Sequence, residues 1–435
     1  MNSMLKIYAI LLLISVNPFS VILKAQTYDT LRVMSYNLTN YGNTIDGCVN
    51  ATNGPALKNP EFKNIIKHVL PDLLGVCEMN TNPTLANNFL NNVLNTDGVT
   101  HYKRSNQQAE TSGTITSILY YDSEKLVLAN QSFAATSPRL THHFRLYLKT
   151  NELQNGDTIW INVLACHLKA GSTASDATDR ANSAATIRTY LNSFSKTENC
   201  LMMGDFNVYR SSEVAFQNLT AAGTRPAYQF LDPVNRVGSW GSNASFADVH
   251  SQCPSLGYNP GCYSGGGLDD RLDFILMNRH ALYDSSGLRY LTGTYKALGN
   301  DGLHYNKNIT DSPINNSVPS AVLQSLYKAS DHLPIVTRLR VKGSFITGLS
   351  SVIQKRTFAL QLLENFFLVS GLEDGISVAL QFSDASGKIL WTGEEVVRDS
   401  ALDLPQFNCP KGLIFVRAIA ENKYYSTSKF LKFKP

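Results

Sequence analysis

Apolar segments of strand length alternate with segments of helical periodicity over most of this chain, from Thr27 to about Lys342. The strand-like runs lie at residues 31–36, 73–77, 115–121, 159–166, 200–203, 272–277 and 335–339. Apolar residues at helical spacing mark one helix over residues 62–69 and a longer one over residues 181–194. This mixed order predicts an α/β or α+β fold with buried sheets arranged in layers.

Several of the strand-like segments carry, at one end, a polar residue that can bind metal or phosphate. These residues are Asn37 in RVMSYNL, Glu78 in DLLGVCEMN, His167 in NVLACHLKAG, Asp205 and Asn207 in MMGDFNV, Asp273 in DDRLDFIL, and Asp331 with His332 in ASDHLPI. A single Asp or Asn at a strand end is usually a turn former or a helix cap, and a lone His is usually structural. Apolar strands that all deliver an acid, amide or imidazole can instead converge at one edge of a layered sheet.

The residue types at these strand ends suit the cleavage of phosphoesters. Carboxylate and amide oxygens are hard ligands for Mg²⁺, Mn²⁺ or Ca²⁺, which neutralise a phosphate and stabilise developing charge. Histidines supply general acid and base capacity near neutral pH. No Cys/His cluster in the sequence has the spacing of a zinc site. The pattern therefore predicts phosphoryl chemistry assisted by a hard divalent cation.

Six short motifs carry a resemblance to a known superfamily. SYN, CEMN, HLKAG, GDFN, RLDFIL and SDHLPI match, in order, the motifs of the endonuclease/exonuclease/phosphatase superfamily, which includes DNase I. The match covers about residues 30–340, and GDFN followed at a distance by SDHLP is specific as a pair. The resemblance implies a four-layered α/β sandwich with two packed mixed sheets and an active site at one edge of them.

The same resemblance implies metal-ligand and general-base roles for five of these residues. Glu78 would be the principal ligand of Mg²⁺, or of Mn²⁺ or Ca²⁺, assisted by Asn37 and Asp331. His332 would act as the general base on the attacking water. Asp273 would accept a hydrogen bond from the other ring nitrogen of His332 and orient it.

Three further residues are implied to act on the phosphate. Asp205 and Asn207 would hold the phosphate and either the nucleophile or the leaving group. His167 would contact the phosphate or help to protonate the leaving oxygen. Within such families the general base is either the His or the Asp of GDFN, so the two roles are not separated here.

The predicted function is that of a secreted, divalent-metal-dependent phosphodiesterase, a hydrolase of phosphoester bonds, with DNA or RNA as the leading substrate. GDFN differs from the WxGDxNxR form of inositol phosphatases, which leans away from phosphoinositides. A sphingomyelinase-like or inositol-phosphate-type phosphoesterase, a monoester phosphatase and a non-catalytic surface binding module remain alternatives. The formal net charge of +4 is too small to indicate a nucleic-acid partner by itself.

The first residues have the pattern of a bacterial secretory signal peptide, residues 1–25. A lysine is followed by an apolar run that is interrupted at Asn17 and Pro18, and cleavage is expected near Ala25. A membrane anchor is the alternative, and no later stretch reaches the length of a bilayer span. The mature chain is expected to be a secreted or cell-surface protein, and a monomer.

A second domain is predicted from residue 345 to residue 435, after the catalytic domain of residues 27–342. Apolar residues alternate at Ile376, Val378, Leu380 and Phe382, as in a half-buried strand, and predict a small β-sandwich. Its end, LDLPQFNCPKGLIFVRAIAENKYYSTSKFLKF, resembles the C-terminal sorting domain of the bacterial type IX secretion system. The resemblance implies that secretion machinery as a partner; a carbohydrate- or protein-binding module is the alternative.

Cysteines and loop residues leave further questions open. Cys77, Cys166 and Cys200 lie in or beside apolar runs and are expected to be buried thiols, whereas Cys253 and Cys262 are expected to form a disulfide.

Long irregular stretches at residues 233–268 and 292–321 have the length of functional loops. Their aromatic residues could stack on bases or pack the loops: Trp240, Tyr258, Tyr263 and Tyr305. Phosphate contact or a surface role is open for Arg139 and Lys169, and His304 could shape a substrate groove.

Overall fold

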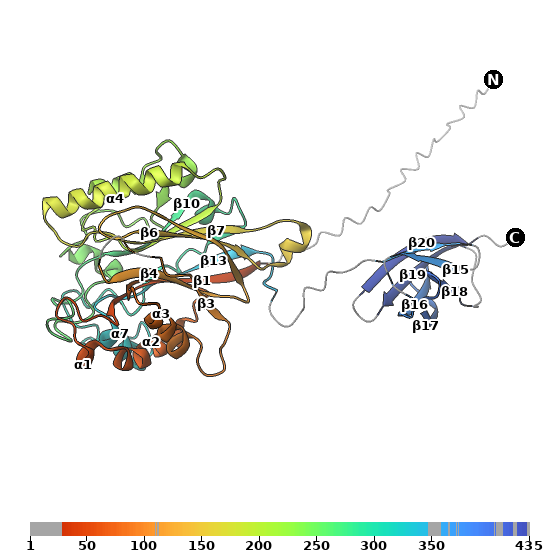
Figure 1. Ribbon diagram of the computed structural model, residues 1–435, viewed down its shortest axis with the longest axis horizontal. Helices are drawn as coiled ribbons and strands as arrows, with labels where there is room; N and C mark the ends of the chain where they lie inside the picture. The colour runs from red at the N-terminus through yellow and green to blue at the C-terminus, as the bar shows by residue number, and fades with distance from the viewer. Residues whose placement is uncertain are drawn as a thin grey trace, which may run out of the picture. The chain divides into compact units, whose positions relative to one another are not determined.

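Two units make up the chain in the computed structural model, residues 1–347 and residues 348–435 (Figure 1). The structure describes residues 28–108, 110, 113–346, 358–363, 366–370, 372, 374–403, 405, 412–420 and 424–432. The expected signal peptide lies outside these described residues and stays a prediction. No helix in the described part of the chain is long and apolar enough to span a membrane.

The first sheet of the N-terminal unit has the strand order β11-β13-β1-β2-β4-β3, and β12 also pairs with β13. Its strands are β1 (Tyr28–Tyr41), β2 (Leu73–Asn80), β3 (Tyr102–Arg104), β4 (Ile115–Asp122), β11 (Leu288–Tyr290), β12 (Lys296–Ala297) and β13 (Ile335–Lys342). Only β1 and β2 are parallel to each other; the other pairs in this sheet are antiparallel.

The second sheet has the order β5-β6-β7-β8-β10-β9. Its strands are β5 (Leu126–Ala134), β6 (Thr141–Leu148), β7 (Trp160–His167), β8 (Asn199–Asp205), β9 (Phe230–Leu231) and β10 (Asp273–Asn278). Here β7 and β8 form the parallel pair. Each sheet thus contains one parallel pair, and its two strands end at the same edge.

Helices cover the outer face of each sheet, with α4 on one side and α2, α3 and α7 on the other (Figure 1). The helices of this unit are α1 (Asn50–Asn53), α2 (Pro55–Val69), α3 (Pro83–Phe89), α4 (Ala174–Asn192), α5 (Val214–Thr220), α6 (Arg279–Tyr283) and α7 (Ser320–Ala329). A π-turn (Leu90–Leu94) and 3₁₀ turns (Asn151–Asn155, Pro226–Tyr228 and Ala244–Val249) complete the set. The predicted four-layered α/β sandwich with two packed mixed sheets is confirmed.

Strand β8 explains why residues 200–203 form a continuous apolar run in the sequence. Every residue of Asn199–Asp205 is buried. Leu201 and Met203 belong to the core between the sheets, whereas Cys200 and Met202 face the second core beneath α4. Successive side chains point to opposite faces of a strand, so a strand covered on both faces must be apolar at every step.

The C-terminal unit contains two small antiparallel sheets. One comprises β14 (Ala359–Leu362), β15 (Phe366–Ser370) and β18 (Ala401–Asp403), and the other β16 (Ser377–Asp384), β17 (Ile389–Val396), β19 (Gly412–Ala420) and β20 (Tyr424–Lys432). Both sheets contribute to one apolar core that includes Phe367, Val378 and Phe382. The predicted β-sandwich is confirmed, and its role as a sorting domain stays a prediction.

The predicted Cys253–Cys262 disulfide is wrong, because Cys262 pairs with Cys48. The Cys48 and Cys262 Cα atoms lie 4.3 Å apart although 214 positions separate them in sequence. Cys253 is a buried free thiol that donates a hydrogen bond to the carbonyl oxygen of Ser264 at 2.8 Å. Proximity along one loop suggested the wrong partner, since only the folded sheet brings residue 48 beside this loop.

The other cysteines of the strand-like runs behave as expected. Cys77, Cys166 and Cys200 are buried free thiols. Cys409 lies outside the described residues.

Gly204 lies directly before Asp205 at the end of β8, and its replacement tests how closely β7 and β8 pack there. Its φ is +134°, and an added Cβ would lie 1.9 Å from the carbonyl oxygen of Cys166 on the parallel neighbour. Gly204→Ala should lower the free energy of unfolding by roughly 2–4 kcal/mol, from overpacking and left-handed backbone strain together. Chemical denaturation measures it. Gly98→Ala is the control, because Gly98 has a φ of +87° but open space around its Cβ position; equal losses in both variants would contradict the overpacking.

Candidate active site

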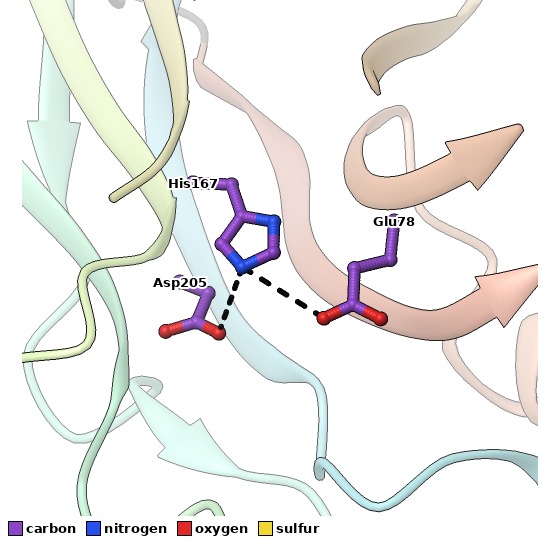
Figure 2. A group of neighbouring side chains, drawn as sticks. All are labelled: Glu78, His167 and Asp205. Atoms are coloured by element: carbon purple, nitrogen blue, oxygen red, sulfur yellow. Dashed lines mark ion pairs between the residues drawn. The ribbon is translucent and has the colours of Figure 1, made fainter. Parts of the chain in front are cut away.

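The ends of the two parallel strand pairs bring acidic and imidazole side chains together at one edge of the sandwich. Glu78 on β2, His167 at the end of β7 and Asp205 at the end of β8 face one another (Figure 2). His167 Nε2 lies 3.7 Å from Glu78 Oε1 and 3.6 Å from Asp205 Oδ2. These residues come from different sheets, so the site spans the seam between the two layers.

Two irregularities in strand pairing set the direction of the Asn37 and Glu78 side chains in the first sheet. The β1–β2 register shifts between Asn37 and Tyr41, and the β2–β4 register shifts between Val76 and Met79. Glu78 consequently has a φ of +58°, an uncommon backbone conformation for a residue with a side chain. Bulges of this kind redirect side chains at functional edges.

Glu78 is fixed by two donors from β1. The Asn37 amide Nδ2 donates to its Oε1 at 2.9 Å, and the Asn40 backbone N–H donates to its Oε2 at 2.8 Å. Burial raises the pKa of the Glu78 carboxyl, and the negative charge of Asp331 raises it further. The carboxylate is therefore oriented but short of compensating positive charge.

Asp205 lies at the centre of the site. It accepts hydrogen bonds from Asn37 Nδ2 at 3.1 Å and from the Asn207 backbone N–H at 2.9 Å. Burial raises the pKa of Asp205 to about 7; the nearby His332 acts against this shift, and Asp273 and Glu78 add to it. Several carboxylates thus compete for ionisation in a small buried volume.

The two histidines differ in electrostatic environment. Burial lowers the pKa of His167 well below its usual value, with a further contribution from the Arg139 guanidinium, so His167 is neutral. Burial acts in the same direction on His332, but the Asp273 carboxylate, together with Asp205 and Asp331, outweighs it and raises the pKa of His332 well above the usual value. The imidazole beside Asp273 is therefore the stronger base of the two.

A hydrogen-bonded chain holds that second imidazole. His332 Nδ1 lies 2.7 Å from Asp273 Oδ2, and the Ser251 hydroxyl donates to the same carboxylate oxygen at 2.7 Å. With Nδ1–H donated to Asp273, the other nitrogen, Nε2, is the one that faces the site. It lies 3.9 Å from Asp205 Oδ2, and the Gln252 amide Nε2 lies 2.7 Å from it. This arrangement fixes both the tautomer and the direction of the base.

Asp331 and Asn207 complete the predicted set. The Thr39 hydroxyl donates to Asp331 Oδ1, and the Ser264 backbone N–H donates to Oδ2 at 2.8 Å. Asn207 has a φ of +50° and donates from Nδ2 to the carbonyl oxygen of Leu168 at 3.2 Å. All eight residues predicted from the sequence thus lie at this one edge.

The donor atoms suit a hard divalent cation. One group of possible ligands comprises Glu78, His167 and Asp205, and another comprises Asp205, Asp273 and His332, with the ligand atoms of each group within 4.8 Å of one another. Carboxylate oxygens predominate, as Mg²⁺, Mn²⁺ or Ca²⁺ requires. The raised pKa values of Glu78 and Asp205 also indicate that the folded site lacks positive charge. The residues present therefore fit a divalent cation.

A cavity of about 370 Å³ opens over this edge. Arg139 lines it and donates from Nε and Nη2 to the carbonyl oxygens of His167 and Leu168. Lys169 instead pairs with Asp176 at 2.7 Å. His304 binds Asp301 and two backbone carbonyl oxygens within the second long loop, away from the residues that line the cavity. Of these three open cases, only Arg139 belongs to the site.

The aromatic residues of the long loops pack against protein. Trp240 is fully buried against Phe216 and Phe274. Tyr263 is largely buried, packs against the ring of Tyr258 in a tilted arrangement, and its hydroxyl lies within hydrogen-bond distance of the carbonyl oxygens of Lys328 and Ala329 at the end of α7. Trp240 and Tyr263 thus pack the loops, whereas Tyr209, which sequence reasoning missed, lines the cavity near Asn207.

Sequence reasoning also missed the residues that orient the site. These are Thr39, Asn40, Lys58, Ser251, Gln252 and Ser264. Thr39 and Asn40 lie at the end of β1, Lys58 lies on α2, and the other three lie outside the helices and strands. They act through backbone groups or hydrogen bonds of common polar side chains, so no motif marks them. Lys58 is the least expected, because its ammonium group is buried and donates to the carbonyl oxygens of Leu38 and Thr39.

No protein-family model and no curated protein matches the chain. Among solved structures, an endonuclease/exonuclease/phosphatase family protein from Bacteroides thetaiotaomicron is similar at 14% identity, over 73% of this chain and 97% of that one, with a TM-score of 0.43. One from Bacteroides vulgatus has 14% identity over 72% of this chain and 100% of that one, with a TM-score of 0.44. A mannosyl-6-phosphatase from Bacteroides thetaiotaomicron has 14% identity over 71% and 99%, with a TM-score of 0.41.

Replacement of Lys58 tests whether its contacts with the β1 backbone hold the metal-binding residues in position. Lys58→Met removes the ammonium that binds the β1 bulge between Asn37 and Asn40, so the affinity for a divalent cation should fall about 10–100-fold, as for other outer-shell partners. Calorimetric Mn²⁺ titration measures it. Lys67→Met on the same helix is the control, since Lys67 is half exposed and pairs with Asp97. Unchanged Mn²⁺ affinity in folded Lys58→Met would contradict this role.

Proposed function

We propose that the N-terminal unit is a divalent-metal-dependent phosphoester hydrolase of the endonuclease/exonuclease/phosphatase type, acting as a phosphodiesterase. The observation that carries the proposal is the meeting, at one sheet edge, of buried carboxylates with an Asp273-oriented His332. A binding module would have no need of a base held in one tautomer beside a cluster of ion-binding carboxylates. The ordered motifs and the geometry support the same chemistry independently.

Glu78 is proposed as the principal ligand of the cation, with Asn37 and Asp331 assisting. A bound divalent cation would neutralise the phosphate and polarise its phosphorus–oxygen bonds. Asn37 has a second task in this scheme, because its amide group donates to both Glu78 and Asp205 and keeps the two carboxylates apart. The Thr39 hydroxyl and the Ser264 N–H hold Asp331 in a single orientation.

His332 is proposed to take the proton from the attacking water at Nε2. Asp273 accepts the hydrogen bond from His332 Nδ1–H and stabilises the imidazolium that results, as the short Nδ1–Oδ2 contact allows. Asp205 lies within 4 Å of His332 Nε2 and, with Asn207, is proposed to orient the phosphate and the nucleophile or leaving group. His167 is neutral and buried, so it is proposed to contact the phosphate or assist the leaving oxygen.

Nucleic acid is the substrate that we propose first. The GDFN form of the motif differs from the form found in inositol phosphatases, which disfavours a phosphoinositide substrate. Tyr209 and Arg139 both line the cavity, where an aromatic ring can stack on a base and a guanidinium can bind phosphate. A sphingomyelinase-like or inositol-phosphate-type activity uses the same chemistry and is separated from nuclease activity by direct assay.

Export is the proposed context of this activity. The N-terminal pattern of residues 1–25 has the features of a signal peptide. The Cys48–Cys262 disulfide supports export, because structural disulfides persist in oxidising compartments. The C-terminal β-sandwich is proposed as the sorting domain recognised by type IX secretion machinery.

Glu78→Gln and His332→Asn test the assignment of the site. His332→Asn should lower kcat by about 10²–10⁴-fold, the usual contribution of an acid–base group, and Glu78→Gln should lower it by at least as much through loss of the principal metal ligand, while the fold is retained. Initial rates and circular dichroism measure the two effects. Glu124→Gln is the matched control, because Glu124 is an exposed carboxylate in the β4–β5 turn. Full activity of either site variant would refute the assignment.

A substrate panel with and without EDTA tests the proposed chemistry and substrate class. Plasmid DNA should be cleaved in Mg²⁺ or Mn²⁺, RNA hydrolysis should follow the same metal dependence, and EDTA should abolish both. Sphingomyelin and inositol phosphates serve as the competing substrates. Hydrolysis only of these would reject the nuclease while retaining the phosphoesterase, and EDTA-resistant activity would reject the metal-dependent scheme.

A further inference from the structure

The Cys48–Cys262 disulfide lies at the rim of the catalytic cavity. Cys262 itself lines the cavity, and so does Asp46, two residues before Cys48. Both half-cystines are buried, and they join the segment after β1 to the long loop that precedes β10. The crosslink therefore connects two cavity walls that the chain supplies from opposite ends of the domain.

A donor for a carboxylate of the site lies near each half-cystine. Ser264, two residues after Cys262, donates its backbone N–H to Asp331 Oδ2 at 2.8 Å. At the end of β1, which leads into the segment of Cys48, Asn40 donates its backbone N–H to Glu78 Oε2 at 2.8 Å. The Asn40 amide Nδ2 also lies 3.6 Å from Cys48 Sγ. The crosslink is thus connected to Asp331 through Ser264, two residues away, and to Glu78 through Asn40, whose side chain contacts Cys48.

Little other packing holds these segments together. Cys48, Cys262 and Tyr263 form a small apolar cluster of their own, separate from the two main cores of the domain. A direct polar link between the segments is an exposed hydrogen bond from Asn259 Nδ2 to the Thr52 carbonyl oxygen. The backbones approach closely, because a Cβ on Gly47 would lie 1.8 Å from the Gly261 carbonyl oxygen. The Cys48–Cys262 disulfide therefore holds together two segments that share only a small apolar cluster.

We propose that the Cys48–Cys262 disulfide is a positioning crosslink of the active site, which holds the Asn40 and Ser264 N–H groups on Glu78 and Asp331 and makes activity depend on the redox state. Reduction adds two electrons and two protons to the disulfide and leaves two thiols; dithiothreitol supplies them and becomes a cyclic disulfide. The freed segments then separate, and both carboxylates lose a fixed donor. The effect on activity rests on the phosphoesterase function proposed above.

Cys253 is the thiol that could exchange with this disulfide. It lies in the same loop as Cys262, but burial raises the pKa of its thiol to about 12. Almost no thiolate is then present at neutral pH, and thiolate is the species that attacks a disulfide. The folded protein therefore keeps the 48–262 pairing in preference to the neighbouring 253–262 pairing.

The test uses the full-length protein, as wild type and as Cys48→Ser/Cys262→Ser. Mn²⁺ affinity is measured by calorimetry well below the melting temperature, and turnover is measured in parallel. The crosslink-free variant should bind Mn²⁺ at least about tenfold more weakly, the scale of other outer-shell losses at metal sites. Cys200→Ala is the control, because Cys200 is a buried free thiol beneath α4, away from the cavity.

A lowered melting temperature with unchanged Mn²⁺ affinity and turnover would overturn the proposal, because a purely structural staple predicts that result. If the double variant does not fold, the folded wild type is reduced with dithiothreitol, its thiols are alkylated, and the same titration is made. Amide hydrogen exchange at Asn40 and Ser264 is followed before and after reduction. Faster exchange supports the proposal even if no phosphoesterase activity is found, and unchanged exchange overturns it whatever the activity.

Discussion

Repulsion among buried carboxylates is the constraint on which the rest of this structure depends. Glu78, Asp205, Asp273 and Asp331 gather at one edge, where burial and the neighbouring carboxylates raise the pKa of Glu78 and of Asp205. A folded protein tolerates such a cluster only if donors and cations compensate it. Many of the polar contacts around the site are fixed donors of this kind, and a divalent cation is the compensation that the donor set suits.

The two-sheet architecture makes this gathering possible. A parallel pair in each sheet directs two strand ends to the same edge, and packing of the sheets brings the two edges together. Antiparallel partners add Asp273 opposite Asp205 and the segment before β13 that carries Asp331 and His332. The apolar cores on both faces of β8 keep this edge from moving when charge is placed on it, because a closely packed interior resists deformation.

The sequence predicts this centre well because its residues follow directly from strand periodicity. Asn37, His167 and Asp205 each come where an apolar run stops, and buried strands stop at sheet edges. The surrounding residues were not predictable in the same way. Asn40 and Ser264 act through backbone N–H groups that every residue type possesses, Lys58 reads as an ordinary surface lysine on a helix, and the partner of Cys262 lies 214 positions away. Their roles arise from tertiary contact alone.

Two different kinds of support therefore meet at the site. His332 and Asp205 are fixed from behind by the packed sheets and by the Ser251–Asp273 chain, so their geometry depends on the cores. Glu78 and Asp331 take donors from the end of β1 and from the loop before β10, where the buried Lys58 side chain and a disulfide hold the chain. The proton-transfer side should thus stay ordered as long as the domain is folded. The ion-binding side can loosen by itself, and this separation is what would allow redox state to change activity without unfolding the protein.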